Sequence, residues 1–210
     1  MLPSAVARVC AATALAVAVA LAAAACAGGA GGAPTPAEPT RIAERMGGLV
    51  IAPDLVFTTA VDGYELAPQS VGSSGEIGMS ATWFNAGTGT MVTLRTERGE
   101  LTAQTCEQTP LWEAPDAVVV CAKEQGVWHR TAGGIHEYVA ASGTALIRLV
   151  GRGAPPADLL AAAMAVRVPS DVELDVLFSD APARVSAPVD RGDLPEHGDG
   201  APINPTGPGG

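Results

Sequence analysis

The chain has few basic residues. Lysine and arginine together number 12, against 22 aspartates and glutamates, and the formal net charge is −10. Lys123 is the only lysine. No stretch interleaves basic and aromatic side chains as binding to a phosphate backbone requires, so nucleic acid is not expected as a partner. An acidic surface is also repelled by anionic lipid headgroups, so association with a membrane would need a lipid anchor.

Motifs of catalysis and metal binding are missing as well. The chain has no G-x-S-x-G, S-x-x-K, H-E-x-x-H or phosphate-binding loop. His129, His136 and Glu137 fall on adjacent expected strands, but strand alternation places His136 and Glu137 on opposite faces. The alternating acidic residues of 171–175 lack the glycine and closing glutamate of a calcium loop, and we expect them to be half-exposed charges on a strand or at a helix start. The sequence therefore predicts no catalytic residue, no metal site and no cofactor.

One long hydrophobic run is present, at the N-terminus. Arg8 is the only charged residue among residues 1–25, and residues 9–25 are almost entirely apolar. About 17 apolar residues is the lower limit for a membrane span. Alanine is only weakly hydrophobic, however, and the run ends in small residues, as secretory signals do. We interpret residues 1–25 as a signal peptide, with an uncleaved anchor as the alternative.

The run Ala23-Ala24-Ala25-Cys26, followed by Ala27-Gly28-Gly29, resembles the end of a bacterial lipoprotein signal. In that family a lipobox of small residues precedes an invariant cysteine, which receives a diacylglyceryl group and becomes the mature N-terminus. The family prefers leucine three residues before the cysteine, where this chain has Ala23. The resemblance implies lipidation of Cys26 and anchoring on the extracytoplasmic face of the cell membrane. Cleavage by an ordinary signal peptidase, with secretion, is an alternative.

The overall composition is similar to that of envelope lipoproteins from GC-rich actinobacteria. Alanine, glycine, proline, valine and arginine are used heavily, while lysine occurs once. This resemblance is compositional and identifies no family for the folded part of the chain.

The chain has four cysteines. Cys10 lies in the expected signal and Cys26 is the expected lipid site, which leaves Cys106 and Cys121. An even pair in an oxidising compartment favours a disulfide, and closing a loop of about 15 residues would stabilise the fold by roughly 3 kcal/mol. A redox pair and a zinc site are rival interpretations, but C-x-x-C spacing is absent and no His or Cys lies nearby at ligand spacing.

Composition divides the remaining chain into three parts. Residues 26–40 are rich in Gly and Pro and predict a flexible tether after the lipidated cysteine. Residues 41–180 have the length of a single domain, expected to lie outside the cytoplasm. Residues 181–210 are rich in Pro, Gly and Asp, which predicts a disordered tail.

Residues 117–150 predict an antiparallel meander. The β-branched run at 117–121 is typical of a strand buried on both faces. Further strands are expected at 127–131, 135–140 and 144–150, separated by short turns that contain glycine. Such short turns between consecutive strands imply antiparallel neighbours.

A helix is expected after Gly153 and before Pro169. Leu159, Ala163 and Val166 form its apolar stripe. A helix of about three turns is not stable alone in water, so it should pack on the meander. The sequence thus predicts an α+β fold, in which an antiparallel sheet carries a C-terminal helix on one face.

The first half of the domain has a weaker pattern. It predicts a helical turn at 41–46, short strands at 49–51 and 55–59, and a hairpin formed by 79–84 and 91–96. The even-numbered residues of the second hairpin strand, which are mostly apolar, should face inward.

Aromatic residues make up only 4% of the chain. Trp112 lies in the expected disulfide loop and Trp128 follows a tight turn, so both are expected either as contacts to a partner or as local core at the sheet's open edge. A sheet with a helix on one face leaves its other face for a ligand or partner. The sequence favours a non-catalytic binding or interaction domain, whose partner is an envelope protein or a small apolar ligand. An exported hydrolase with an unrecognised active site is the alternative.

Overall fold

The structure is a computed structural model that describes residues 34–183. The predicted signal, Cys26 and nearly all of the predicted tail lie outside the described residues. Helices and 3₁₀ turns are α1 (Pro39–Arg45), η1 (Pro53–Leu55), η2 (Pro68–Ser70), α2 (Ala103–Gln108), α3 (Pro156–Met164) and α4 (Asp171–Leu177). Strands are β1 (Glu65–Leu66), β2 (Gly72–Ser74), β3 (Gly78–Asn85), β4 (Thr90–Arg98), β5 (Val120–Glu124), β6 (Val127–Ala132), β7 (Ile135–Ser142) and β8 (Ala145–Arg152).

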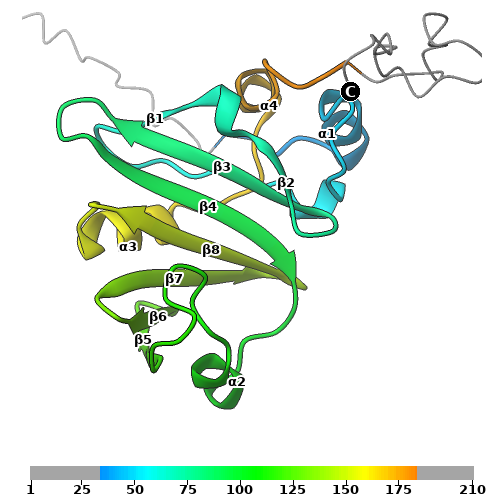
Figure 1. The fold of residues 1–210 in the computed structure, drawn as a ribbon. Coiled ribbons are helices and arrows are strands. Elements are labelled where there is room, and N and C mark those ends of the chain that lie inside the picture. Colours follow the sequence, from blue (N-terminus) through cyan, green and yellow to red (C-terminus); the bar gives the residue numbers. More distant parts are fainter. Residues whose placement is uncertain (1–33, 184–210) are drawn as a thin grey trace, which may run out of the picture. The chain divides into compact units, whose positions relative to one another are not determined.

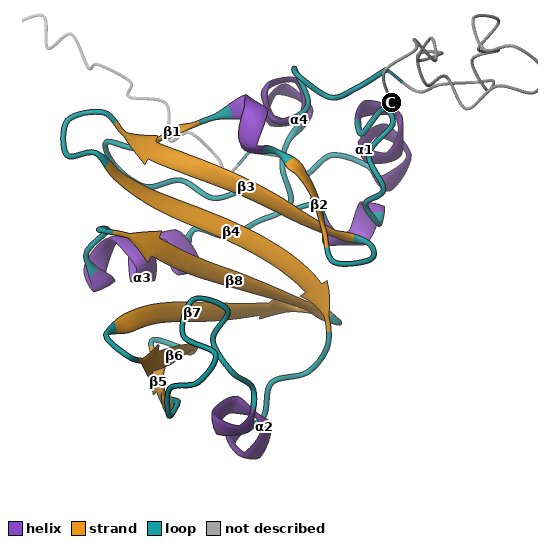
Figure 2. Ribbon diagram, in the orientation of Figure 1, coloured by secondary structure: helices purple, strands orange, loops and turns teal. Residues whose placement is uncertain are grey.

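All eight strands form one antiparallel sheet (Figures 1 and 2). Its order is β1-β3-β4-β8-β7-β6-β5, and β2 pairs with β3 beside β1. α3 packs against β7 and β8. The α+β class and the antiparallel sheet with a C-terminal helix on one face are therefore confirmed.

The meander from β5 to β8 is set by its turns. Gln125 and Gly126 join β5 to β6, and Gly133 and Gly134 join β6 to β7, all four with positive φ. Two consecutive residues with positive φ make the type I′ turn, whose twist suits a two-residue hairpin. Glycine adopts positive φ without a steric clash, which explains why the Gly133-Gly134 pair lies between β6 and β7.

The hairpin predicted in the first half is confirmed as β3 and β4. Val92 and Leu94 on β4 are fully buried, and Leu94 lies opposite Leu149 of β8. The strands of both halves therefore belong to one sheet. The short strands predicted at 49–51 and 55–59 are wrong, because η1 occupies part of this stretch and Thr58 makes only an isolated bridge with Arg167.

The sequence located α3 correctly but extended it too far. The helix ends at Met164, and the backbone of Arg167 instead pairs with that of Thr58. The sequence did not predict α4 as a helix. Ser170 and Glu173 form a reciprocal capping box at its start, which satisfies two backbone N–H groups that would otherwise lack partners.

The folded region begins before the predicted boundary at residue 41. α1 starts at Pro39, and Ala37 is already buried in the core. Ala37 also donates its backbone N–H to the carbonyl of Pro169. The last residues of the predicted tether thus pack on the domain, because a small apolar residue and a proline at a helix start both fit there.

One large core lies between a face of the sheet and the helices α1, α3 and α4. It contains buried residues from each of these elements, including Ile42, Leu159, Leu174, Met79 and Leu149. Among residues 34–183 no helix combines the length and the apolar character needed to cross a bilayer.

The prediction that residues 117–121 form a strand buried on both faces is wrong. β5 begins only at Val120 and is the last strand of the sheet, so it has a neighbour on one side. Val118 and Val120 are 86% and 61% exposed, while Val119 is buried. A β-branched run indicates a strand but does not show whether the strand lies at the centre or at the edge of the sheet.

Candidate functional site

The sheet face opposite α3 is partly covered by a second, smaller layer. In Figure 1 this layer consists of α2 and the loop that follows it, which passes over β7. The Cys106–Cys121 disulfide ties α2 to β5, as the sequence predicted. Leu111, Val119 and Ala132 form a small buried cluster beneath the loop. The disulfide and this cluster fix the loop against the sheet.

Arg130 is the buried cation that holds this layer. Its guanidinium is fully buried and forms an ion pair with Glu137, which lies directly opposite on β7. It also donates hydrogen bonds to the carbonyls of Cys106 and Thr109, at the end of α2. Burial lowers the pKa of Arg130 from its ordinary value, and the carboxylate of Glu137 partly offsets this. An arginine pKa remains far above neutral pH, so this cation stays charged and needs its anion.

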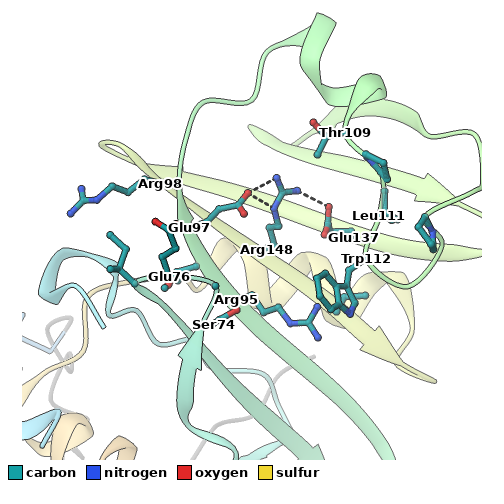
Figure 3. Close-up of a pocket in the computed structure, with 17 residues that line it drawn as sticks. Ser74, Glu76, Arg95, Glu97, Arg98, Thr109, Leu111, Trp112, Glu137 and Arg148 are labelled. Atoms are coloured by element: carbon teal, nitrogen blue, oxygen red, sulfur yellow. Dashed lines mark hydrogen bonds and ion pairs between the residues drawn. The ribbon is translucent and has the colours of Figure 1, made fainter. Parts of the chain in front are cut away.

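The ion pair continues along the sheet as a chain of alternating charges. Glu137 accepts a hydrogen bond from Nη1 of Arg148 on β8 at 3.0 Å. Arg148 Nε and Nη2 lie 2.8 and 2.7 Å from Oε1 of Glu97 on β4. Figure 3 shows Arg148 between the two glutamates. All three nitrogens of this guanidinium are thus occupied.

These charged residues form the floor of a pocket of about 770 Å³. One wall is the turn between β2 and β3, which includes Glu76 and Ile77, and the other is the disulfide loop around Trp112. The lining carries three arginines and three glutamates beside several apolar side chains, namely Arg95, Arg98, Arg148, Glu76, Glu97, Glu137, Ile77, Leu111, Trp112 and Val150. The volume is in the range of small-molecule sites.

Arg95 lies between the floor and the loop. It is opposite Arg148 across β4 and β8. Its Nη1 is 3.4 Å from Oε1 of Glu113, and its guanidinium carbon lies 5.4 Å from the ring centre of Trp112. A cation within about 6 Å of an indole ring is attracted by it.

The two tryptophans that the sequence singled out lie in different settings. Trp112 is 79% exposed at the pocket wall. Trp128 is half-buried, donates its indole N–H to the carbonyl of Leu101 at 3.1 Å, and has the Lys123 ammonium over its ring at 4.9 Å. The structure thus places Trp112 where a ligand can reach it and packs Trp128 as part of the sheet's local covering.

The two histidines lie on the other face of the sheet, away from the pocket. Nε2 of His129 is 2.9 Å from Nδ1 of His136, and its ring stacks on Tyr138 with centroids 4.3 Å apart. Burial, followed by the charge of His136, lowers the pKa of His129, which Glu124 partly offsets. Burial and a hydrogen bond to Glu124 raise the pKa of Tyr138 to about 12. The predicted separation of His136 and Glu137 onto opposite faces is confirmed.

The acidic residues of 171–175 lie at the start of α4, where they form ion pairs with arginines. Asp175 contacts Arg45, and Glu173 contacts Arg167. Burial alone would raise the pKa of Glu173, but hydrogen bonds from Ser170 and the charge of Arg167 outweigh it and lower the pKa. Within residues 34–183 no cluster of three or more His, Cys, Asp or Glu side chains is placed to hold a metal ion.

The charged floor of the pocket was not predicted from the sequence. Alternation predicted that Arg95 points outward, and its side chain does lie on the sheet face opposite the main core, where it lines the pocket rather than facing open solvent. The available signal was at least one charged residue on the same face of each strand, namely Arg95 and Glu97 on β4, Arg130 on β6, Glu137 on β7 and Arg148 on β8.

Comparison with known proteins identifies no relative of this chain. No family model, curated protein or solved structure matches the chain.

Proposed function

We propose that this protein is a lipid-anchored envelope lipoprotein whose extracytoplasmic domain binds a small ligand without chemical conversion. Cys26 carries the lipid, the signal peptide is removed, and the domain stands outside the cell membrane. The observation that carries the binding function is the pocket of about 770 Å³, with Trp112 exposed at its wall.

The location rests on two independent features. The first is the lipobox-like run before Cys26. The second is the Cys106–Cys121 disulfide, because disulfides persist in oxidising compartments and are rare in the cytosol.

The binding function is supported by the preorganised pocket. Its floor consists of ion-paired side chains on three central strands, and its loop wall is held by a disulfide and by the buried Arg130. A site whose walls are fixed before binding loses little conformational entropy when the ligand arrives. The exposed indole of Trp112 supplies the kind of rigid aromatic surface that dominates binding energy elsewhere.

The alternative of an exported hydrolase has less support. His129 and His136 hydrogen-bond to each other on the face opposite the pocket. Within the described part of the chain neither imidazole has a hydrogen bond to a Ser, Thr or Cys side chain, which is the contact that activates a nucleophile.

The anchor is tested by intact mass. Protein extracted from membranes should begin at Cys26 and carry the mass of a diacylglyceryl group. A Cys26→Ala variant should lack this mass and leave the membrane fraction. An unmodified wild-type chain found in the medium would disprove the anchor.

The binding function is tested with Nile red, a neutral apolar dye that fluoresces when it leaves water. The full chain with Cys26→Ser, which cannot receive a lipid, is titrated with the dye. Wild-type pocket residues should give saturable binding, and Trp112→Ala should weaken it. Phe84→Ala is the matched control, because Phe84 is an exposed aromatic on the same sheet face outside the pocket. Absence of saturable binding, or equal loss in both variants, would overturn the proposal.

A further inference from the structure

We propose that the pocket binds a carboxylate joined to an apolar body, and that Arg95 is the residue that receives the carboxylate. This inference rests on the proposed binding function and assigns the chemical class of its ligand. It follows from which pocket arginine still has hydrogen-bond donors to offer.

Two of the three arginines in the pocket lining are already occupied. Every nitrogen of Arg148 contacts Glu97 or Glu137. Arg98 holds Asp54 in a two-point contact, with Nη1 and Nη2 at 2.6 and 2.8 Å from its carboxylate oxygens. Such paired contacts leave little to bind an incoming anion.

Arg95 is different because its one acidic partner within residues 34–183 is distant. Nη1 lies 3.4 Å from Glu113, beyond the usual range for such a bond. Among the described residues, its Nε and Nη2 have no hydrogen-bond partner. Besides this long contact, the guanidinium lies over the Trp112 ring, with its carbon 5.4 Å from the ring centre. It therefore presents a planar pair of donors that fits the two oxygens of a carboxylate.

The pairing of β4 with β8 places two arginines side by side on the pocket face. Arg95 and Arg148 lie directly opposite each other across the β4–β8 pair, and like charges in that position repel. Arg148 is neutralised by two glutamates, whereas Arg95 has only the long contact to Glu113. A bound carboxylate would occupy the donors of Arg95 that Glu113 leaves free and would offset the repulsion between the two arginines.

The same pocket limits the ligand to one negative charge. Glu76, Glu97 and Glu137 also line it, and they would repel a second anionic group. The pocket also offers apolar contacts, because Ile77 and Trp112 line opposite walls and Val150 lies on the floor. A monocarboxylate with an apolar body satisfies both the single available cation and these surfaces.

The test uses competition with Nile red by decanoate and by decanamide, its neutral counterpart of similar length. Decanoate should displace the dye from the Cys26→Ser chain at much lower concentration than decanamide does. Arg95→Gln should weaken decanoate binding roughly 10- to 100-fold, the cost of losing a charge-assisted hydrogen-bond pair. Decanamide binding should change little in the same variant.

Arg98→Gln is the matched control. It removes the same charge from the pocket's edge, but its guanidinium is held by Asp54. We expect a change of less than about fivefold in decanoate affinity, as for an exposed ion pair. The unfolding midpoint of each variant, measured in urea, verifies that the domain is folded.

The failures of the two proposals give different results. If Nile red binds but decanoate competes no better than decanamide, or if Arg95→Gln and Arg98→Gln weaken decanoate equally, the carboxylate inference is wrong and the binding function stands. If acetate competes as well as decanoate, the apolar body has no role and the inference is wrong. If neither the dye nor decanoate binds, the binding function itself is wrong.

Discussion

Replacing Glu137 with glutamine tests how much the free energy of unfolding depends on an anion beside the buried charge of Arg130. The substitution keeps the side chain's size and one acceptor oxygen but removes the charge. The Arg130 side chain is 0% exposed, so no water can replace the lost anion. Breaking a buried ion pair by removing one partner costs about 3–5 kcal/mol. Because glutamine still accepts a hydrogen bond, we expect about 3 kcal/mol, the lower end of that range.

Glu97→Gln provides the control within the same charge chain. The Glu97 side chain is 51% exposed and contacts Arg148, which keeps Glu137 as a second partner. An exposed pair contributes about 0–1 kcal/mol. Urea unfolding at neutral pH, with the disulfide intact, gives both values from the shift in midpoint at an unchanged m-value. Equal losses of unfolding free energy in the two variants would refute the reasoning.

A double variant separates the charge from the hydrogen bonds. Arg130→Met combined with Glu137→Leu removes both charges and leaves apolar side chains in their place. If the uncompensated cation causes the cost of Glu137→Gln, the double variant should be more stable than the single one. A greater loss in the double variant would show that the hydrogen bonds from Arg130 to the α2 carbonyls matter more.

Three further predictions concern other parts of the domain. Reducing the Cys106–Cys121 disulfide, which spans 15 residues, should lower the unfolding free energy by about 3 kcal/mol and weaken Nile red binding. Unchanged binding would show that the loop keeps its position in the pocket wall without the disulfide. The pKa of His129 is lowered from 6.5 in the folded state, so the unfolded chain binds this proton more readily. The free energy of unfolding should therefore decline as pH falls below about 6.5. His129→Gln should flatten that decline, as measured by urea midpoints across this pH range. The pKa of Glu173 is also lowered, so Glu173→Gln should cost about 1 kcal/mol near neutral pH, and this difference should vanish as pH falls through the lowered pKa.

The local parts of the fold were accessible from the sequence because short turns determine them. The Gly133-Gly134 pair fixes the register of β6 and β7, and that register places Arg130 opposite Glu137. The capping box at Ser170 and Glu173 is likewise a local signal for α4, since a serine followed three residues later by a glutamate marks a helix start, and it was overlooked.

The long-range parts were not accessible in the same way. Arg95 lies opposite Arg148 only because β4 pairs with β8, and no turn connects these strands. Most residues of 49–59 are apolar and cover the core without belonging to a strand, and burial of that kind has no period that would distinguish it from short strands. The pocket depends on the same long-range pairing, so its residues could be recognised as charged but not as neighbours.

The charged residues on the pocket face of the sheet divide into those that stabilise the fold and one, Arg95, that we propose binds the ligand. At one end of the charge chain Arg130 and Glu137 are buried and contact only each other and fixed groups of the domain, with Nε of Arg130 left without a hydrogen bond, so a change there should act on folding. Arg95 lies beside this chain, opposite Arg148; 33% of its side chain is accessible, and among the described residues it contacts the Glu113 carboxylate at 3.4 Å and the Trp112 ring. A change at Arg95 should therefore act on ligand affinity while leaving the urea midpoint nearly unchanged. If Arg95→Gln destabilised the domain as strongly as Glu137→Gln, its guanidinium would be a structural group and could not be the receptor for a carboxylate.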